Sequence, residues 1–106
     1  MSHTKAHYTD ADAVAGGLHF LRDELSCENL GVSVLDCDPD WEGKPHDHAE
    51  DGQEEVYVLV DGEATVTVDG EDVELSTGDA LRVAPDERRQ IRNGDVESRF
   101  VIAGAP

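Results

Sequence analysis

The sequence predicts an all-β, single-domain protein: a jelly-roll sandwich or small barrel of about six to eight strands with a short N-terminal arm. The chain has 106 residues, enough for one domain with a modest core. From about residue 30 onward, apolar and polar residues alternate with a period of two, as half-buried strands do. Glycine and aspartate turns interrupt this alternation at regular intervals. We expect the arm to cover residues 1–17 and the β-barrel domain to cover 18–106.

The N-terminal third is expected to contribute few elements. Residues 10–15 either make a helical turn before the glycine pair 16–17 or belong to a loose arm. The apolar residues within 18–25 indicate an early hairpin that joins the sheet. Residues 32–37 predict a longer strand with apolar groups on both faces.

Residues 55–76 predict three strands joined by two hairpins. The dipeptides Asp61-Gly62 and Asp69-Gly70 favour the tight primed turns that connect antiparallel neighbours. Later strands are expected at residues 80–83, about 88–92 and 97–103.

The charge balance is strongly negative, with 25 acidic and 8 basic residues and a formal net charge of −17. Such a surface repels nucleic acid and anionic membranes, so we expect neither as a partner. The acids are dispersed and lysine is scarce, which resembles proteins of halophiles whose cytoplasmic salt screens the self-repulsion. Because no apolar run could cross a bilayer and no leader is evident, we expect a cytoplasmic protein.

Two cysteines, Cys27 and Cys37, lack the spacing of a redox pair. We expect reduced, partly buried thiols, with a disulfide between neighbouring strands as the alternative.

The segment His46-Asp47-His48 is the most informative about function. Histidines at i and i+2 point to the same face of a strand. Glu55 opens the next predicted strand and can lie opposite them. Two imidazoles and a carboxylate that converge form a site for divalent iron, manganese, zinc or nickel. The sequence therefore predicts a metal site at His46, His48 and Glu55.

This histidine pair, with Glu55 and the turn residue Gly62, resembles the first motif of the cupin superfamily, in which two histidines and a glutamate bind a metal inside a small β-barrel. Residues 78–93 resemble the second motif, and the resemblance covers roughly residues 30–103. It implies a cupin β-barrel, a divalent metal cofactor and a small-molecule ligand or substrate. As small cupins often pair through edge strands, which covers unpaired backbone groups, we also expect a homodimer.

The first motif departs from the family in its loop. Residues 49–54 separate the second histidine from Glu55, which is longer than cupins usually have. Glu50, Asp51 or Glu54 could therefore compete for the ligand role. The distance of Glu55 from the turn glycine favours Glu55.

The second motif departs more, because Arg89 stands where the family usually has its fourth ligand, a histidine. A guanidinium stays protonated and has no lone pair for a metal. In one interpretation, the three remaining ligands hold the metal with open positions, and Arg89 anchors an anionic substrate of a dioxygenase or isomerase. In the other, Arg89 replaces the metal and pairs with Glu55, which leaves a ligand-binding or structural module.

Tyr57 shares the strand face of Glu55. It is expected either to line the pocket as a substrate-binding residue or to belong to the barrel core.

Overall fold

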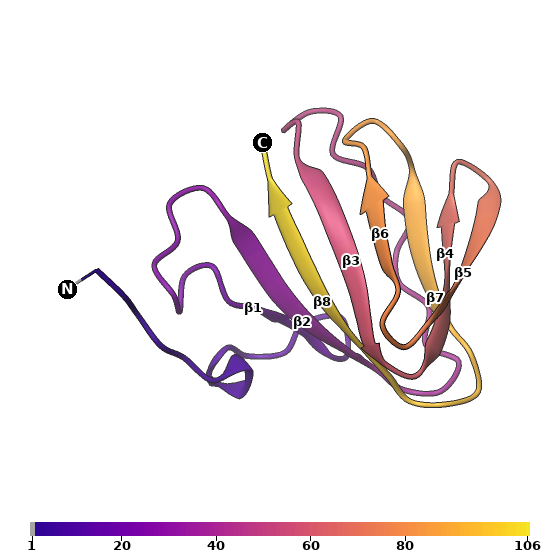
Figure 1. Ribbon diagram of the computed structural model, residues 1–106, viewed down its shortest axis with the longest axis horizontal. Helices are drawn as coiled ribbons and strands as arrows, with labels where there is room; N and C mark the ends of the chain where they lie inside the picture. Colours follow the sequence, from indigo (N-terminus) through magenta and orange to yellow (C-terminus); the bar gives the residue numbers. More distant parts are fainter. Residues whose placement is uncertain (1) are drawn as a thin grey trace.

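The computed structural model describes residues 2–106 as two antiparallel sheets with one short 3-10 turn, η1 (Tyr8–Asp10) (Figure 1). The strands are β1 (Leu18–Phe20), β2 (Gly31–Cys37), β3 (Glu54–Asp61), β4 (Glu63–Val68), β5 (Glu71–Ser76), β6 (Ala80–Val83), β7 (Arg89–Asn93) and β8 (Ser98–Ala105). The predicted all-β fold is confirmed. Within residues 2–106, no helix is long and apolar enough to cross a membrane.

Two sheets form the barrel walls. The five-stranded sheet has the order β1-β2-β8-β3-β6, and the three-stranded sheet has the order β5-β4-β7 (Figure 1). Every strand pair is antiparallel, and β8, near the C-terminus, lies between β2 and β3. The centre of the larger sheet therefore depends on pairings between residues far apart in the chain.

The core lies between the two sheets and follows the period-two alternation of the strands. On β3, Tyr57 and Leu59 point inward and are fully buried, whereas Val60 is exposed. Phe100 on β8 packs edge-on against Tyr57, with 6.5 Å between the ring centroids. Val66 on β4 meets this cluster from the other sheet. Burial of these apolar side chains on both inner faces holds the sheets together.

One of the two predicted hairpins is present and the other is wrong. Asp69 and Gly70 both have positive φ, and they join β4 and β5 as antiparallel neighbours. The turn at Asp61-Gly62 instead carries the chain from one sheet to the other, because β3 is already paired on both edges with β6 and β8. A side chain at Gly62 would also collide with Ser98, since its Cβ would lie 2.4 Å from the Ser98 Oγ.

The N-terminal residues contact the outside of the larger sheet. The turn η1 overlaps the predicted helical turn only at Asp10. The early hairpin predicted within residues 18–25 is wrong in form, because a turn follows the single strand β1, but β1 does join the sheet by pairing with β2. The Tyr8 hydroxyl donates to Asp36 Oδ2 at 3.0 Å, and the Arg99 guanidinium lies over the Tyr8 ring. The division into an arm and a barrel domain at residue 17 stays a prediction.

Both cysteines are free thiols. Cys27 is half-buried and Cys37 is buried at the end of β2. Desolvation raises the pKa of the Cys37 thiol to about 12, and the nearby charges of Asp36 and Asp38 add to this effect.

Candidate metal site and cavity

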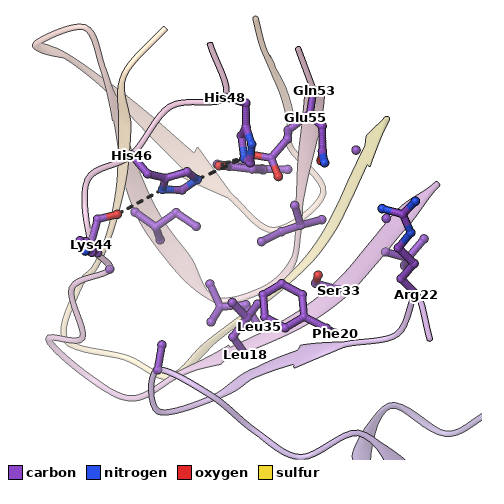
Figure 2. Close-up of a pocket in the computed structure, with 18 of the residues that line it drawn as sticks. Leu18, Phe20, Arg22, Ser33, Leu35, Lys44, His46, His48, Gln53 and Glu55 are labelled. Atoms are coloured by element: carbon purple, nitrogen blue, oxygen red, sulfur yellow. Dashed lines mark hydrogen bonds and ion pairs between the residues drawn. The ribbon is translucent and has the colours of Figure 1, made fainter. Parts of the chain in front are cut away.

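A cavity of about 500 Å³ opens between the two sheets, on the side where β1 and β2 form the wall. Pockets of roughly 300–1,000 Å³ hold small-molecule ligands. Figure 2 shows His46, His48 and Glu55 on one side of this cavity and the apolar side chains of Leu18 and Leu35 on the opposite side. The three predicted metal ligands therefore face a space of ligand size.

The two histidines lie on an extended segment that runs beside β7. The backbones of His46 and Arg89 exchange two hydrogen bonds of 2.9 and 2.8 Å, and the His48 N–H donates to the Pro85 carbonyl at 2.8 Å. The prediction of a regular strand here is wrong, because only isolated bridges form. Pro45 lacks a backbone N–H, so the ladder cannot continue through it.

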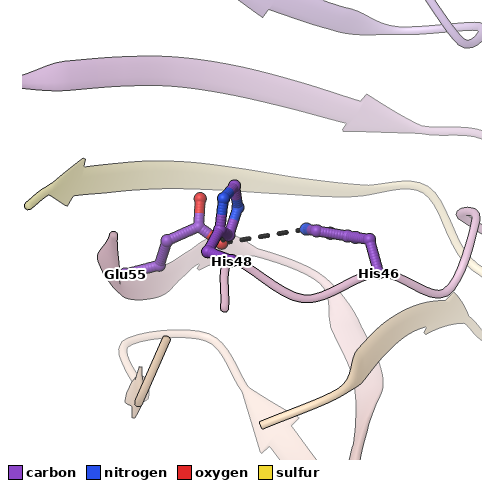
Figure 3. A group of neighbouring side chains, drawn as sticks. All are labelled: His46, His48 and Glu55. Carbon is purple, nitrogen blue, oxygen red and sulfur yellow. Dashed lines mark ion pairs between the residues drawn. The ribbon is translucent and has the colours of Figure 1, made fainter. Parts of the chain in front are cut away.

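The side chains of His46, His48 and Glu55 nevertheless converge (Figure 3). One potential ligand atom from each lies within 4.8 Å of the other two. The Glu55 Oε1 is 3.3 Å from His48 Nε2 and 3.9 Å from His46 Nε2. Ligands about 2.1 Å from one ion at tetrahedral or octahedral angles lie about 3.0–3.4 Å apart, so small side-chain movements would complete this geometry.

The Nδ1 atom of each histidine ring faces an oxygen acceptor outside the site. His46 Nδ1 lies 3.2 Å from the Lys44 carbonyl, and His48 Nδ1 lies 3.1 Å from Asp51 Oδ1. Such contacts favour the tautomer that leaves Nε2 with a free lone pair, the arrangement found around metal-binding histidines. Asp51, one of the competing carboxylates, thus lies behind His48. Glu54, another competitor, forms an exposed ion pair with Arg82.

Glu55 remains a carboxylate although it is largely buried. Burial raises its pKa, but His46, the Tyr57 hydroxyl and the nearby positive charges outweigh this effect, so the net shift of the Glu55 pKa is downward. The Tyr57 hydroxyl donates to Glu55 Oε1 at 3.0 Å. In return, interaction with the Glu55 carboxylate raises the pKa of His46. Tyr57 combines both predicted positions, since it is a core residue that also lines the cavity.

Arg89 lies at the start of β7, with 1% of its surface exposed. Its Nη1 donates to the Glu87 carbonyl at 2.7 Å, and its Nη2 is 3.6 Å from Glu55 Oε1. Within residues 2–106, Nε and Nη2 have no hydrogen-bond partner, and Arg89 is not part of the cavity wall. The structure thus brings Arg89 to Glu55, while its predicted role as a substrate anchor stays a prediction.

Sequence reasoning missed part of the cavity wall. Arg22, Phe20 and the glycines Gly31 and Gly104 line it, although no local motif marks them. Their common position follows only from the pairing of β1, β2 and β8.

Comparison with known proteins agrees with this architecture. The Cupin domain family matches residues 33–104. A crystal structure of a cupin protein from Bacteroides fragilis has a TM-score of 0.83 and 28% identity, covering 99% of this chain and 85% of that one. A Cupin 2 conserved barrel domain protein from Salinispora arenicola has a TM-score of 0.78 and 17% identity, covering 100% and 89%. A predicted oxalate decarboxylase from Thermotoga maritima has a TM-score of 0.72 and 21% identity, covering 83% and 77%.

Comparison with curated proteins gave no match. The solved structures under 25% identity support the fold alone, because one fold hosts many activities. The family match covers most of the strands and both predicted motifs. The chain therefore belongs to the cupin domain family.

Proposed function

We propose that His46, His48 and Glu55 bind one divalent transition-metal ion and that the adjoining cavity binds a small anionic molecule. The observation that carries this proposal is the convergence of three ligand atoms within 4.8 Å on the cavity wall. The donor set of two imidazole nitrogens and one carboxylate suits iron, manganese, zinc or nickel. When bound, such an ion supplies a Lewis acid at this wall.

This proposal includes open coordination positions, because Arg89, at the position of the family's usual fourth ligand, has no lone pair for a metal. Its guanidinium lies 3.6 Å from the Glu55 carboxylate. We propose that Arg89 favours anionic ligands through its charge. Because the buried Arg89 side chain lies behind Glu55, its positive charge would favour anions through the electrostatic potential in the cavity and not through direct contact with the ligand. Open coordination positions suit a metal-dependent dioxygenase or isomerase, and these are the two reaction classes that we propose if the protein is an enzyme.

A second candidate function is a metal-free binding module. The buried Arg89–Glu55 pair favours it, because a cation beside the carboxylate competes with a divalent ion for the same charge. In that case the Arg89 guanidinium compensates the charge of the Glu55 carboxylate, and the cavity binds a ligand without catalysing a reaction.

Metal content after purification in high salt, without chelator or affinity tag, tests the proposal. We expect about one equivalent of a transition metal, as a single three-residue site can hold. The His46→Ala variant should lose it while keeping its circular dichroism spectrum, whereas His3→Ala, a histidine outside the site, should retain it. Wild-type protein that takes up no added zinc, manganese, iron or nickel would favour the metal-free alternative.

Three further expectations also remain proposals: a homodimer formed through edge strands, a salt-accumulating source and a cytoplasmic location. Sedimentation in high salt checks the first of these directly.

A further inference from the structure

A row of inward-facing positions crosses the larger sheet and connects Glu55 to Arg22. Glu55 on β3 pairs with Gly104 on β8, and Gly104 pairs with Gly31 on β2. The register of β1 with β2 continues through a hydrogen bond from the Leu21 N–H to the Val32 carbonyl. Arg22 follows at the start of the turn after β1, and both Arg22 and Gly31 line the cavity. Two glycines thus separate a basic side chain from the proposed metal ligand.

Neither glycine has a positive φ, but a Cβ at Gly104 would crowd the Glu54 backbone carbonyl oxygen at 3.2 Å. A Cβ at Gly31 would make only an ordinary contact, 3.5 Å from the Gly104 carbonyl oxygen. A Cβ at Gly104 would press on the Glu55 Cγ at 3.2 Å. Strands in a sheet are about 4.8 Å apart, so the three steps from β3 to Arg22 span roughly 14 Å of backbone. The glycines leave the middle of this span free of side chains.

The charge of the cavity wall is the reverse of the charge of the chain. Among 25 acidic residues, only Glu55 lines the cavity, whereas the basic residues Arg22 and Lys44 both do. Within the described residues 2–106, no carboxylate oxygen lies within 4.0 Å of the Arg22 guanidinium, and its Nη2 donates to the Glu28 carbonyl. Figure 2 shows Arg22 and Lys44 at opposite ends of the cavity.

The same wall carries an apolar surface next to the glycine floor. Phe20 is 56% exposed although its side chain lines the cavity. Leu18 and Leu35 lie beside it in Figure 2, and Ile102 from β8 faces the same space. An exposed aromatic ring inside a ligand-sized cavity favours a ligand with an apolar body that covers it.

We infer that the cavity binds a small carboxylic acid with an apolar body, held in one orientation. Its carboxylate pairs with Arg22, its body lies on the Gly31–Gly104 floor against Phe20, and its far end reaches His46, His48 and Glu55. The planar guanidinium matches a carboxylate in two parallel hydrogen bonds. The position of the far end rests on the proposed function, but the Arg22 and glycine contacts do not require a metal.

Calorimetric titration with 3-phenylpropanoate and with octanoate, in EDTA, tests the anchor apart from the metal. We expect both acids to bind the wild-type protein. Arg22→Gln should weaken both about two- to five-fold, since Arg22 is exposed and its ion pair is partly screened. Arg88→Gln is the matched control, because Arg88 is also exposed and loses the same charge but lies outside the cavity wall. The uncharged 3-phenylpropanamide should bind wild-type and Arg22→Gln protein equally.

Gly31→Val tests the floor. Valine suits a strand, so we expect a folded protein that keeps its metal content but loses binding of both acids. Failure of either acid to bind wild-type protein, or equal weakening by Arg22→Gln and Arg88→Gln, would overturn the inference. Full binding by Gly31→Val would also overturn it. Metal content is measured separately on the same variants. Because the titrations are done in EDTA, failure of the proposed metal site would not change the expected binding of the two acids.

Discussion

Replacement of Arg89 by glutamine separates the two interpretations of the site. The wild-type side chain is completely buried, and its Nη2 lies 3.6 Å from the Glu55 carboxylate, which is 13% exposed. Removal of one partner of a buried ion pair costs about 3–5 kcal/mol. Here Glu55 retains the Tyr57 hydroxyl and the two imidazoles, so we expect a smaller loss, about 2 kcal/mol. For a domain of about 100 residues, this lowers the Tm by roughly 8–16 °C in EDTA.

Metal affinity should change in the opposite direction. An ion about 2.1 Å from Glu55 Oε1 lies at most about 6 Å from Arg89 Nη2. At 6 Å, even in the dielectric of bulk water, a divalent ion and a guanidinium repel each other by about 1.4 kcal/mol, which corresponds to about ten-fold in affinity. At low ionic strength the Arg89→Gln variant should therefore bind zinc about ten-fold more tightly than the wild-type protein.

Thermal unfolding with EDTA and with saturating zinc, together with calorimetric zinc titration, measures both effects. Arg88→Gln is the control for the change in net charge, since Arg88 is exposed and outside the site. The reasoning is refuted if Arg89→Gln unfolds at the wild-type temperature in EDTA. It is refuted equally if the variant binds zinc more weakly, because Arg89 would then support the metal site instead of competing with it.

Two further predictions concern the buried polar groups near the opposite end of the barrel. Asn93→Ala should destabilise the protein by about 2–3 kcal/mol in urea unfolding. The Asn93 side-chain amide donates to the carbonyls of Cys37, Asp38 and Val96, and all three would lose that donor. An unchanged urea midpoint would contradict this account. The unfolding free energy should fall as the pH rises from about 9 to 12, because the folded Cys37 thiol keeps its proton while the unfolded thiol loses it. Cys37→Ala should flatten that dependence, and an equally steep decline in the variant would assign it to other groups.

The sequence alone predicts the strands well but not their partners. The alternation along residues 55–60 and the turn dipeptides identify β3, β4 and β5 because these patterns are local. The hairpin at Asp61-Gly62 was mispredicted because a turn dipeptide specifies a local bend and not the strand across it. The edge where β4 would have paired is occupied by β8, about forty residues later in the chain.

The residues of the candidate site likewise include some that the sequence could predict and some that it could not. His46, His48 and Glu55 could be predicted because ligand chemistry and spacing mark them within one short stretch. The substitution at Arg89 is visible in the motif, but its burial and its contact with Glu55 depend on the packing of β7 against β3. Arg22, Gly31 and Gly104 could not be predicted, because the pairing of β2 with β8 and of β8 with β3 brings the glycines beside Glu55, and Arg22 reaches the same cavity from the turn after β1.

The cavity wall differs in charge from the strongly acidic chain as a whole. The chain has 25 acidic residues, but within residues 2–106 Glu55 is the one carboxylate that lines the cavity, together with the basic residues Arg22 and Lys44. Under the proposed salt-accumulating source, the Debye length at about 1 M salt is about 3 Å, so attraction of an anion from a distance is lost. Selectivity then depends on direct contact with a guanidinium and on apolar burial, which excluded salts strengthen. Arg22 beside Phe20 provides both within one cavity, and this combination suits a carboxylate with an apolar body better than a polar anion such as phosphate.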